Sequence, residues 1–310
     1  MIGDCEDMVE TQTVHDLTSV EAVQRALAEQ RYVCETSLAT AIYLALKLPK
    51  PLLLEGEAGV GKTEVAKVLA SALGTDLIRL QCYEGLDISH AVYEWNYPRQ
   101  MLAIRLLEDQ QVGRDVAMQE IFSEAFLIER PLLKAIRHQG RPPVLLIDEI
   151  DRADEEFEAF LLELLSDFQI TIPEIGTIRA TQPPYVIITS NRTRELHDAL
   201  KRRCLYHWID YPSLEKEFQI LTVRLPGISE RLARQVARFI QALRREDLYK
   251  LPGVAETLDW AAALLALNQQ ELTVEVASAT LGAILKHQED VQYIRKKKLD
   301  DLVATAVAES

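Results

Sequence analysis

The sequence has few of the features that mark secreted, zinc-binding or membrane proteins. Its four cysteines lie far apart, and no Cys-x-x-Cys or Cys/His ligand spacing occurs, which argues against zinc and against a disulfide framework. We find no signal-peptide pattern, and the longest apolar runs are too short for a membrane span. These absences predict a chain in the reducing environment of the cytoplasm.

Positive charge is also scarce. Lysine and arginine number 34 against 48 aspartates and glutamates, which gives a formal net charge of −14. A general grip on nucleic acid needs a basic surface, so the charge argues against a nucleic-acid partner. The one basic cluster, residues 295–298, is interpreted as a solvated helix end.

Residues 56–63 read Gly-Glu-Ala-Gly-Val-Gly-Lys-Thr, the pattern of a phosphate-binding loop. The loop follows the apolar run 51–54 and opens the helical pattern 64–70, which is the strand-loop-helix setting that the motif requires. Glycines let the backbone turn with its N–H groups inward, and the helix directs its positive end at the phosphates. We predict that ATP binds to Gly56, Glu57, Ala58, Gly59, Val60, Gly61, Lys62, Thr63 and Glu64. The alternative is a purely structural glycine turn.

Two carboxylates follow the apolar run 143–147. A strand that ends in Asp148 and Glu149 places both at the carboxyl edge of the sheet, where ligands of α/β proteins bind. We expect Asp148 and the Thr63 hydroxyl to hold magnesium, and Glu149 to polarise the attacking water. The alternative is a strand that ends in solvated acids.

Two further strand-associated motifs complete the candidate site. Residues 185–189 form an apolar strand that leads to Asn191, whose amide can orient the lytic water; a turn-forming asparagine is the alternative. Arg202 and Arg203 precede the strand 205–209, and one of them, Arg203 first, can reach the nucleotide of a neighbouring subunit. Exposed arginines at a helix end are the alternative.

The order of elements predicts the fold class. Strands at 51–54, 76–82, 143–148, 185–189 and 205–209 alternate with helices, which is typical of a parallel five-stranded α/β sheet with right-handed crossovers. We expect a flexible N-terminus over 1–17, an α/β domain over 18–211 and an all-α domain over 212–310. In the helical part, residues 232, 236, 239, 240 and 243 follow helix spacing.

Residues 83–141 form a long link between two strands. Tyr83, Tyr93, Trp95 and Tyr97 fall within it, and we place an insert at about 83–105. Long connections in compact domains are usually functional, and aromatic residues favour partner surfaces. The rings either pack the insert onto its own domain or form a pore-facing or partner-facing loop.

These four motifs, in this order, resemble the AAA+ superfamily of ring-forming ATPases, over about residues 20–290. The acid motif continues through Arg152 and Ala153 into an amphipathic helix, and residues 169–178 suit a two-stranded hairpin placed at about 170–180. These features resemble the MoxR family. The resemblance implies magnesium-dependent ATP hydrolysis, a homo-oligomeric ring with six subunits as the family habit, and chaperone action on a client protein.

Within that family the chain is similar to the CoxD-like branch, on the segments 80–87, 93–100 and 255–260. The branch implies maturation of a molybdenum hydroxylase, such as carbon monoxide dehydrogenase, beside a von Willebrand factor A-type partner. One departure concerns the lid: many AAA+ lids carry an arginine that touches the γ-phosphate, whereas residues 253–258 offer Thr257 and no arginine. Arg231, Arg234 and Arg238 are the candidates to compensate.

Three other functions compete with this interpretation. A small-molecule kinase would need a compact arginine-rich lid, whereas the helical C-terminal region and the Asn191 and Arg203 motifs favour a ring ATPase. A DNA-handling AAA+ protein conflicts with the acidic charge. A nucleotide-binding switch with little turnover conflicts with the presence of Glu149. We therefore expect a MoxR-type ATPase that acts as a chaperone.

Overall fold

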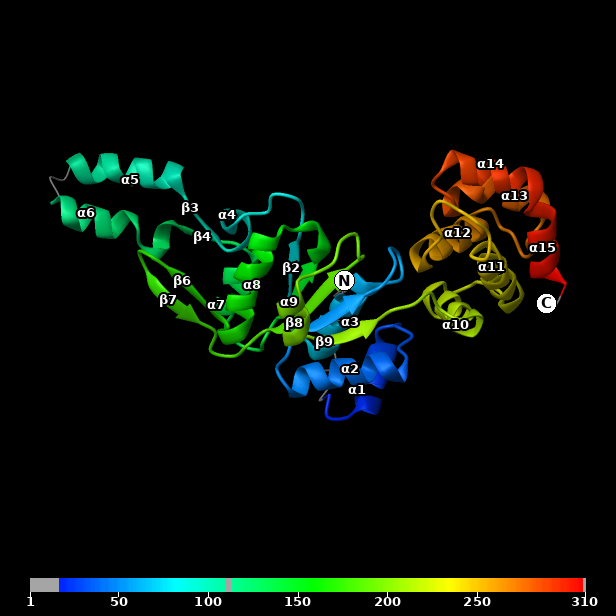
Figure 1. Cartoon of the computed structure of the whole chain (residues 1–310), viewed down its shortest axis with the longest axis horizontal. Coiled ribbons are helices and arrows are strands. Elements are labelled where there is room, and N and C mark those ends of the chain that lie inside the picture. The colour runs from blue at the N-terminus through cyan, green and yellow to red at the C-terminus, as the bar shows by residue number, and fades with distance from the viewer. Residues whose placement is uncertain (1–16, 110–112, 309–310) are drawn as a thin grey trace, which may run out of the picture.

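The computed structural model describes residues 17–109 and 113–308, and its centre is a sheet of five parallel strands (Figure 1). The strand order is β2-β5-β8-β1-β9, which confirms the predicted parallel α/β sheet. The strands are β1 (Leu52–Glu55), β2 (Leu77–Gln81), β5 (Val144–Asp148), β8 (Tyr185–Ser190) and β9 (Leu205–Trp208). Since the sheet is parallel, the carboxyl ends of its strands meet at one edge.

Helices cover both faces of the sheet, which explains why its central strand is apolar throughout. Val144 and Leu146 of β5 pack into one core, and Leu145 and Ile147 pack into the other. The first core receives α1 (Val20–Glu29), α2 (Thr36–Lys47) and α3 (Lys62–Leu73). The second receives α7 (Pro131–Arg137), α8 (Glu155–Asp167) and α9 (Asp198–Arg203). This packing fixes the register of the central strands and thereby the position of the polar residues at their ends.

The long link between β2 and β5 folds into an arm that projects from the sheet (Figure 1). After α4 (Ile88–Ala91), the strands β3 (Tyr93–Trp95) and β4 (Leu127–Glu129) pair antiparallel as its stalk. Beyond the stalk lie α5 (Tyr97–Asp109) and α6 (Arg114–Ile121), and the short helix η1 (Glu124–Phe126) leads back. The arm therefore extends beyond the insert predicted at about 83–105.

The aromatic residues of this arm divide between the two roles considered above. Trp95 is buried and meets Phe122 edge-on at a centroid distance of 5.3 Å, and Tyr93 meets Trp95 at 6.3 Å. Tyr97 is 62% exposed at the start of α5. The stalk rings therefore pack the arm together, while the helical hairpin leaves apolar surface uncovered.

A second hairpin, β6 (Gln169–Ile172) with β7 (Gly176–Arg179), follows α8 at the place expected for it. The short helix η2 (Ile150–Arg152) follows β5. After β9 the regular elements of the described chain are all helices: α10 (Leu214–Arg224), α11 (Glu230–Leu243), α12 (Val254–Ala266), α13 (Val274–Ile284), α14 (Gln288–Lys297) and α15 (Leu299–Val307). They surround a core centred on Phe239 and Trp260, whose rings lie 4.9 Å apart. No helix among the described residues is both long and apolar enough to cross a membrane.

Candidate functional site

The phosphate loop connects β1 to α3 at the carboxyl edge of the sheet. Gly56 has φ 155°, and a Cβ there would lie 2.2 Å from the carbonyl oxygen of Ile209, so no larger residue fits without movement of the chain directly after β9. Gly61, with φ 99°, is the left-handed residue that immediately precedes α3. Glycine adopts this conformation without the steric penalty that a side chain would impose, so the loop can turn directly into the helix.

Lys62 lies inside the loop with only 6% of its surface exposed. Its Nζ donates hydrogen bonds to the carbonyl oxygens of Gly56, at 2.6 Å, and Glu57, at 2.7 Å. Burial lowers the pKa of Lys62 below its ordinary value, and nearby carboxylates, Asp151 first among them, oppose that shift. The loop therefore holds a buried cation where phosphate oxygens would bind.

Thr63 and Asp148 come together at the expected metal position. Thr63 Oγ1 lies 3.0 Å from Asp148 Oδ1, and Asp148 is 2% exposed. Two neighbouring oxygen ligands of a magnesium octahedron lie about 2.9 Å apart. The pair therefore fits magnesium, with nucleotide phosphates and waters as the remaining ligands.

Glu149 follows Asp148 in a left-handed backbone conformation, φ 56°, which is unusual for a residue with a side chain and turns its carboxylate along the sheet edge. Asn191 Nδ2 donates to Glu149 Oε1 at 3.4 Å. Gln81 Nε2 and Arg152 Nε contact the other oxygen, Oε2, at 3.2 and 3.0 Å. The structure thus brings the proposed base and the proposed water-orienting amide into direct contact.

Asp151 is a site residue that the sequence analysis missed. It is 3% exposed and accepts hydrogen bonds from the backbone N–H groups of Asn191, at 3.1 Å, and Thr193, at 2.9 Å, and from the Thr193 hydroxyl at 2.7 Å. Burial acts to raise the pKa of Asp151, but these hydrogen bonds outweigh it and hold the pKa below its ordinary value. Asp151 therefore fixes the loop that carries Asn191. Its place three residues after Asp148 gives no local signal of this role.

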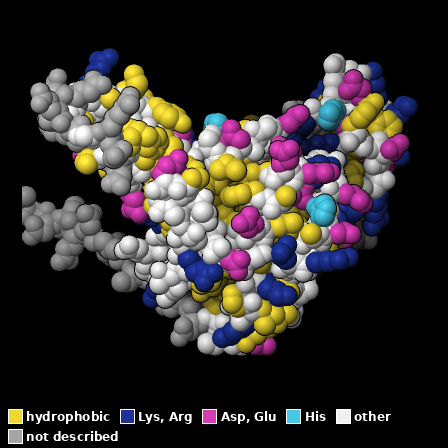
Figure 2. All heavy atoms as spheres, turned by 60° about the vertical axis from the view of Figure 1, so that its left-hand side comes forward, with side chains coloured by type: hydrophobic (Ala, Val, Ile, Leu, Met, Phe, Trp, Pro, Cys, Tyr) yellow, Lys and Arg dark blue, Asp and Glu magenta, His cyan; other side chains and the backbone are white. Residues whose placement is uncertain are grey.

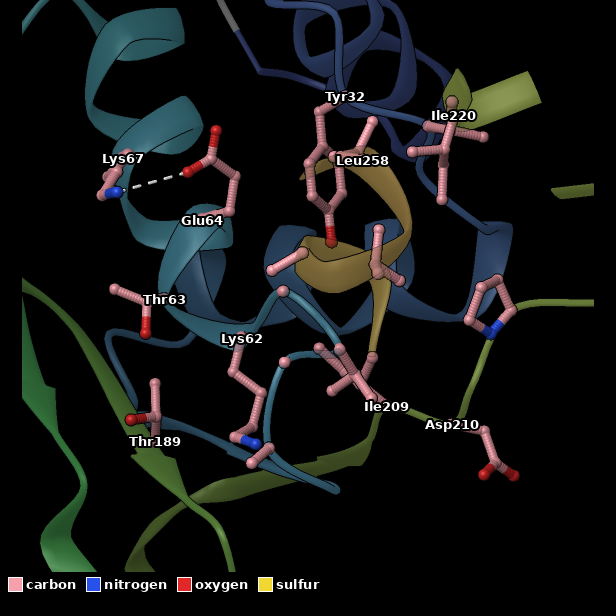
Figure 3. Close-up of a pocket in the computed structure, with 18 of the residues that line it drawn as sticks. Tyr32, Lys62, Thr63, Glu64, Lys67, Thr189, Ile209, Asp210, Ile220 and Leu258 are labelled. Atoms are coloured by element: carbon pink, nitrogen blue, oxygen red, sulfur yellow. Dashed lines mark ion pairs between the residues drawn. The ribbon is translucent and has the colours of Figure 1, made fainter. Parts of the chain in front are cut away.

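A cavity of about 360 Å³ joins these groups to a largely apolar chamber. The cavity is lined by Ala58 to Glu64, Asp148, Glu149 and Asn191, whereas Gly56 and Glu57 form the base of the loop outside it. Tyr32, Ile220 and Leu258 line the chamber, and Figure 3 shows the Tyr32 ring next to Leu258. An apolar pocket beside a phosphate loop suits the base and sugar of a nucleotide.

The helical region closes this cavity through the start of α12. Val254 N donates to the carbonyl oxygen of Gly59 in the phosphate loop at 2.9 Å. A Cβ on Gly253 would lie 2.8 Å from three backbone atoms of Gly59, so the start of α12 and the phosphate loop are in direct backbone contact. This contact ties the position of the helices to the shape of the loop.

Thr257, which stands where the resembled lids carry an arginine, does not line the cavity. Its hydroxyl donates to Glu217 at 2.9 Å and to the Gly253 carbonyl at 3.0 Å. Glu217 is fully buried and is paired with Arg244 at 2.7 and 2.8 Å. Thr257 therefore belongs to a buried network that holds α12 in place.

Other cations of the helical region do line the cavity. Arg224 at the end of α10 pairs with Glu64 at 2.9 Å, and Lys216 pairs with Glu35 at 2.8 Å. By contrast, Arg231 pairs with Glu271 at 2.6 Å. Within the described chain, neither Arg231, Arg234 nor Arg238 lines the cavity, so the replacement for the absent arginine is better sought at Arg224.

Arg202 and Arg203 are exposed at the end of α9, where it leads into β9. Leu205 and Leu52 are in register at the amino ends of their strands, whereas the phosphate loop begins at the other end of β1. Three residue steps along a strand separate the two edges by about 10 Å. The two arginines therefore lie at the opposite edge of the sheet from the cavity of their own chain.

The fold and site define a nucleotide-binding protein of the phosphate-loop class, and comparisons make this more specific. Residues 51–204 match the family described as AAA domain (dynein-related subfamily). The denitrification regulatory protein NirQ of Pseudomonas aeruginosa is 26% identical over 224 residues, which cover 69% of this chain and 76% of NirQ. The protein YeaC of Bacillus subtilis is 23% identical over 304 residues, which cover 89% of this chain and 82% of YeaC.

Among solved structures, a RuvB variant from Thermotoga maritima is 18% identical, with a TM-score of 0.48, and covers 94% of this chain and 85% of that chain. The matched family and the site together identify the α/β unit as an AAA domain. The protein is an AAA+ ATPase that uses ATP with magnesium.

Proposed function

We propose that the chain is a MoxR-type AAA+ chaperone, which uses ATP hydrolysis in a ring to remodel a client protein during maturation of an enzyme complex. In this proposal residues 18–211 are the ATPase domain and residues 212–310 are its lid. The observation that carries the proposal is that Lys62, Thr63, Asp148, Glu149 and Asn191 line one cavity. The same sheet also carries the projecting arm (Figure 1). The similarity to NirQ, which is described as a denitrification regulatory protein, supports a regulatory role.

The residues of the site have complementary tasks in hydrolysis. Lys62 and the loop N–H groups hold the phosphates, and Thr63 and Asp148 would hold magnesium, which when bound offsets the negative charge of the phosphates. Glu149 accepts a proton from the attacking water, and Asn191, in contact with Glu149 at 3.4 Å, orients that water. Because Glu149 acts on the water and not on the phosphates, the loss of Glu149 should stop turnover without preventing nucleotide binding.

A ring supplies the remaining charge. Arg203, with Arg202 as the second choice, lies too far from its own cavity to neutralise charge there, but an exposed position at the sheet edge suits a neighbour's nucleotide. Such an arginine contributes about 10³ to 10⁵ in rate where it has been studied. We propose a homo-oligomeric ring, six subunits being the habit of the resembled family.

The helical hairpin of the arm is the proposed client surface. Tyr97, Met101, Leu102, Leu106, Val116 and Met118 are between 53% and 63% exposed. Figure 2 shows hydrophobic side chains gathered on this lobe, at the upper left. Contiguous exposed apolar side chains mark interaction sites, and methionine adapts to varied surfaces. We propose that this hairpin contacts the client or a von Willebrand factor A-type partner.

The ATPase rate per subunit, measured against protein concentration with Glu149→Gln as the control, tests the shared site. A rate that rises steeply and saturates as a ring forms is expected. Arg203→Ala alone should be inactive yet bind ATP, and mixing it with Glu149→Gln should restore part of the activity. A concentration-independent rate by a monomer, verified by sizing, would refute the ring. Rescue by Arg202→Ala and not by Arg203→Ala would move the role to Arg202.

Maturation of a molybdenum hydroxylase is tested in the native host. Replacement of the gene by its Glu149→Gln form should lower the specific activity and metal content of a host molybdenum hydroxylase without lowering its abundance. Leu102→Glu should have the same effect while the purified protein keeps its ATPase rate. Unchanged hydroxylase activity in both strains would exclude this client class and leave the ATPase assignment intact.

A further inference from the structure

Arg79 lies beside the site but belongs to neither the phosphate loop nor the acid motif. It lies on β2, the edge strand next to β5, where exposed and buried residues alternate. Gln81 is directly opposite Asp148 in the parallel register, and Arg79 shares the exposed face of β2 with Gln81. Arg79 is therefore the residue of β2 that can reach diagonally to Asp148.

The contact between Arg79 and Asp148 is close. Arg79 Nε and Nη2 both donate to Asp148 Oδ2, at 3.0 and 2.5 Å. The hydroxyls of Thr63 and Thr189 donate to the other oxygen, Oδ1, at 3.0 and 2.6 Å. Both carboxylate oxygens are thus engaged, one by hydroxyl groups and one by a guanidinium.

Asp148 needs a cationic partner because its side chain is only 3% exposed. A buried carboxylate without a counter-charge is costly, and Lys62 directs its ammonium to the loop carbonyls instead. Within the described residues, the ion pair found for Asp148 is with Arg79, whose side chain is 48% exposed. Arg79 can therefore leave for solvent at small cost, whereas Asp148 cannot.

Arg79 also reaches the second acid. Its Nη2 donates to Gln81 Oε1, and Gln81 Nε2 in turn donates to Glu149 Oε2 at 3.2 Å. Arg79 thereby fixes which way the Gln81 amide faces. Asp148, Arg79, Gln81 and Glu149 form one continuous chain of contacts between the proposed metal ligand and the proposed base.

We propose that Arg79 is a positioning residue that neutralises Asp148 until magnesium arrives with the nucleotide, and that the metal displaces it. The inference rests on the proposed role of Asp148 as a metal ligand. A guanidinium and a divalent cation at one carboxylate repel each other, so binding of the metal disfavours the ion pair. Displacement also removes the contact that orients Gln81 toward Glu149, so arrival of the metal loosens one of the two contacts at Glu149 Oε2, while Arg152 keeps the other.

The test measures how free magnesium changes the affinity of the full chain for a fluorescent ADP, which avoids turnover. In Arg79→Met, which has a similar length and no charge, the magnesium concentration for half of the effect should fall roughly five-fold. Arg79→Lys should shift it in the same direction but less, since an ammonium lacks the two-pronged contact. Arg231→Met, which removes a paired arginine of similar exposure in the helical region, is the matched control and should not shift it.

Thermal unfolding supplies a second readout. Without magnesium and nucleotide, Arg79→Met should melt below the wild type, and saturating magnesium and ADP should narrow that gap. A magnesium midpoint that is unchanged or raised in Arg79→Met overturns the proposal, and if that variant does not fold, Arg79→Lys decides by the same criterion. Asp148→Asn separates the two levels: if magnesium still tightens ADP binding in that variant, the metal role of Asp148 fails rather than the role of Arg79.

Discussion

The contact between Gly253 and Gly59 gives the most demanding test of how the helical region controls the site. Gly253→Ala adds a single methyl group at a position whose backbone, φ −83° and ψ −174°, is open to any residue. Backbone strain is therefore not the issue. The new Cβ would lie 2.8 Å from the Cα, C and O atoms of Gly59, which are backbone atoms of the phosphate loop and cannot rotate away.

The size of the effect follows from that overlap. Ordinary contact begins near 3.4 Å, so α12 must retreat by about 0.6 Å. The hydrogen bond from Val254 N to Gly59 O, now 2.9 Å, then weakens. Overpacking typically costs about 1 to 3 kcal/mol, and a lost hydrogen bond about 1 kcal/mol. If about 1 to 2 kcal/mol falls on lid docking, nucleotide affinity drops roughly 5- to 30-fold.

Titration with fluorescent ADP and the ATPase rate measure the effect, and Gly282→Ala is the matched control. Gly282 lies in α13 of the same helical region, and no atom lies within 4 Å of a Cβ built there. Gly282→Ala should leave affinity unchanged and stabilise the helix slightly. Equal affinity and turnover in both variants would refute the reasoning that backbone contact at Gly253 couples lid and loop.

Three further predictions concern individual side chains. Asp151→Asn should lower the free energy of unfolding by about 1 to 3 kcal/mol at neutral pH, measured with urea. Because the native pKa of Asp151 is lowered, this loss of stability should persist above pH 3.8 and vanish as the pH falls through the lower native pKa. A difference in stability that does not change with pH would contradict this. Arg224→Ala should weaken binding of a non-hydrolysable ATP analogue roughly three- to ten-fold relative to Arg231→Ala, and equal affinities for the analogue would remove Arg224 from the site. Burial raises the pKa of the thiols of Cys34, Cys82 and Cys204 to about 12, so these three should react slowly with a disulfide reagent at about pH 8 until the chain is unfolded. Fast labelling of any of these three in the native protein, located by peptide mapping, would contradict the prediction.

The local parts of the site could be read from the sequence because each depends on neighbours in the chain. A phosphate loop needs its glycines, lysine and threonine at fixed spacing between a strand and a helix, and residues 56–63 meet that requirement. The strand that leads to Asp148 is apolar throughout because both its faces are buried, and this composition marks it as central. The structure brings Lys62, Thr63, Asp148, Glu149 and Asn191 to the same edge of the sheet as expected.

The extent of the arm was harder to predict. The stalk strands β3 and β4 are each three residues long and pair across the entire helical hairpin. So short a strand has no periodicity of its own, and its partner lies more than 30 residues away. The aromatic cluster pointed to the start of the arm but could not show where the chain returns.

The sequence by itself therefore determined the phosphate loop, the acidic strand end and the order of strands and helices, because these follow from residue type and short-range spacing. Only the tertiary structure decided that Arg79 pairs with Asp148, that Asp151 holds the Asn191 loop and that Arg224 reaches Glu64. These partners lie 69, 40 and 160 residues apart. Such pairings depend on the register of neighbouring strands and on the packing of the helices against the loop, and no local pattern records either.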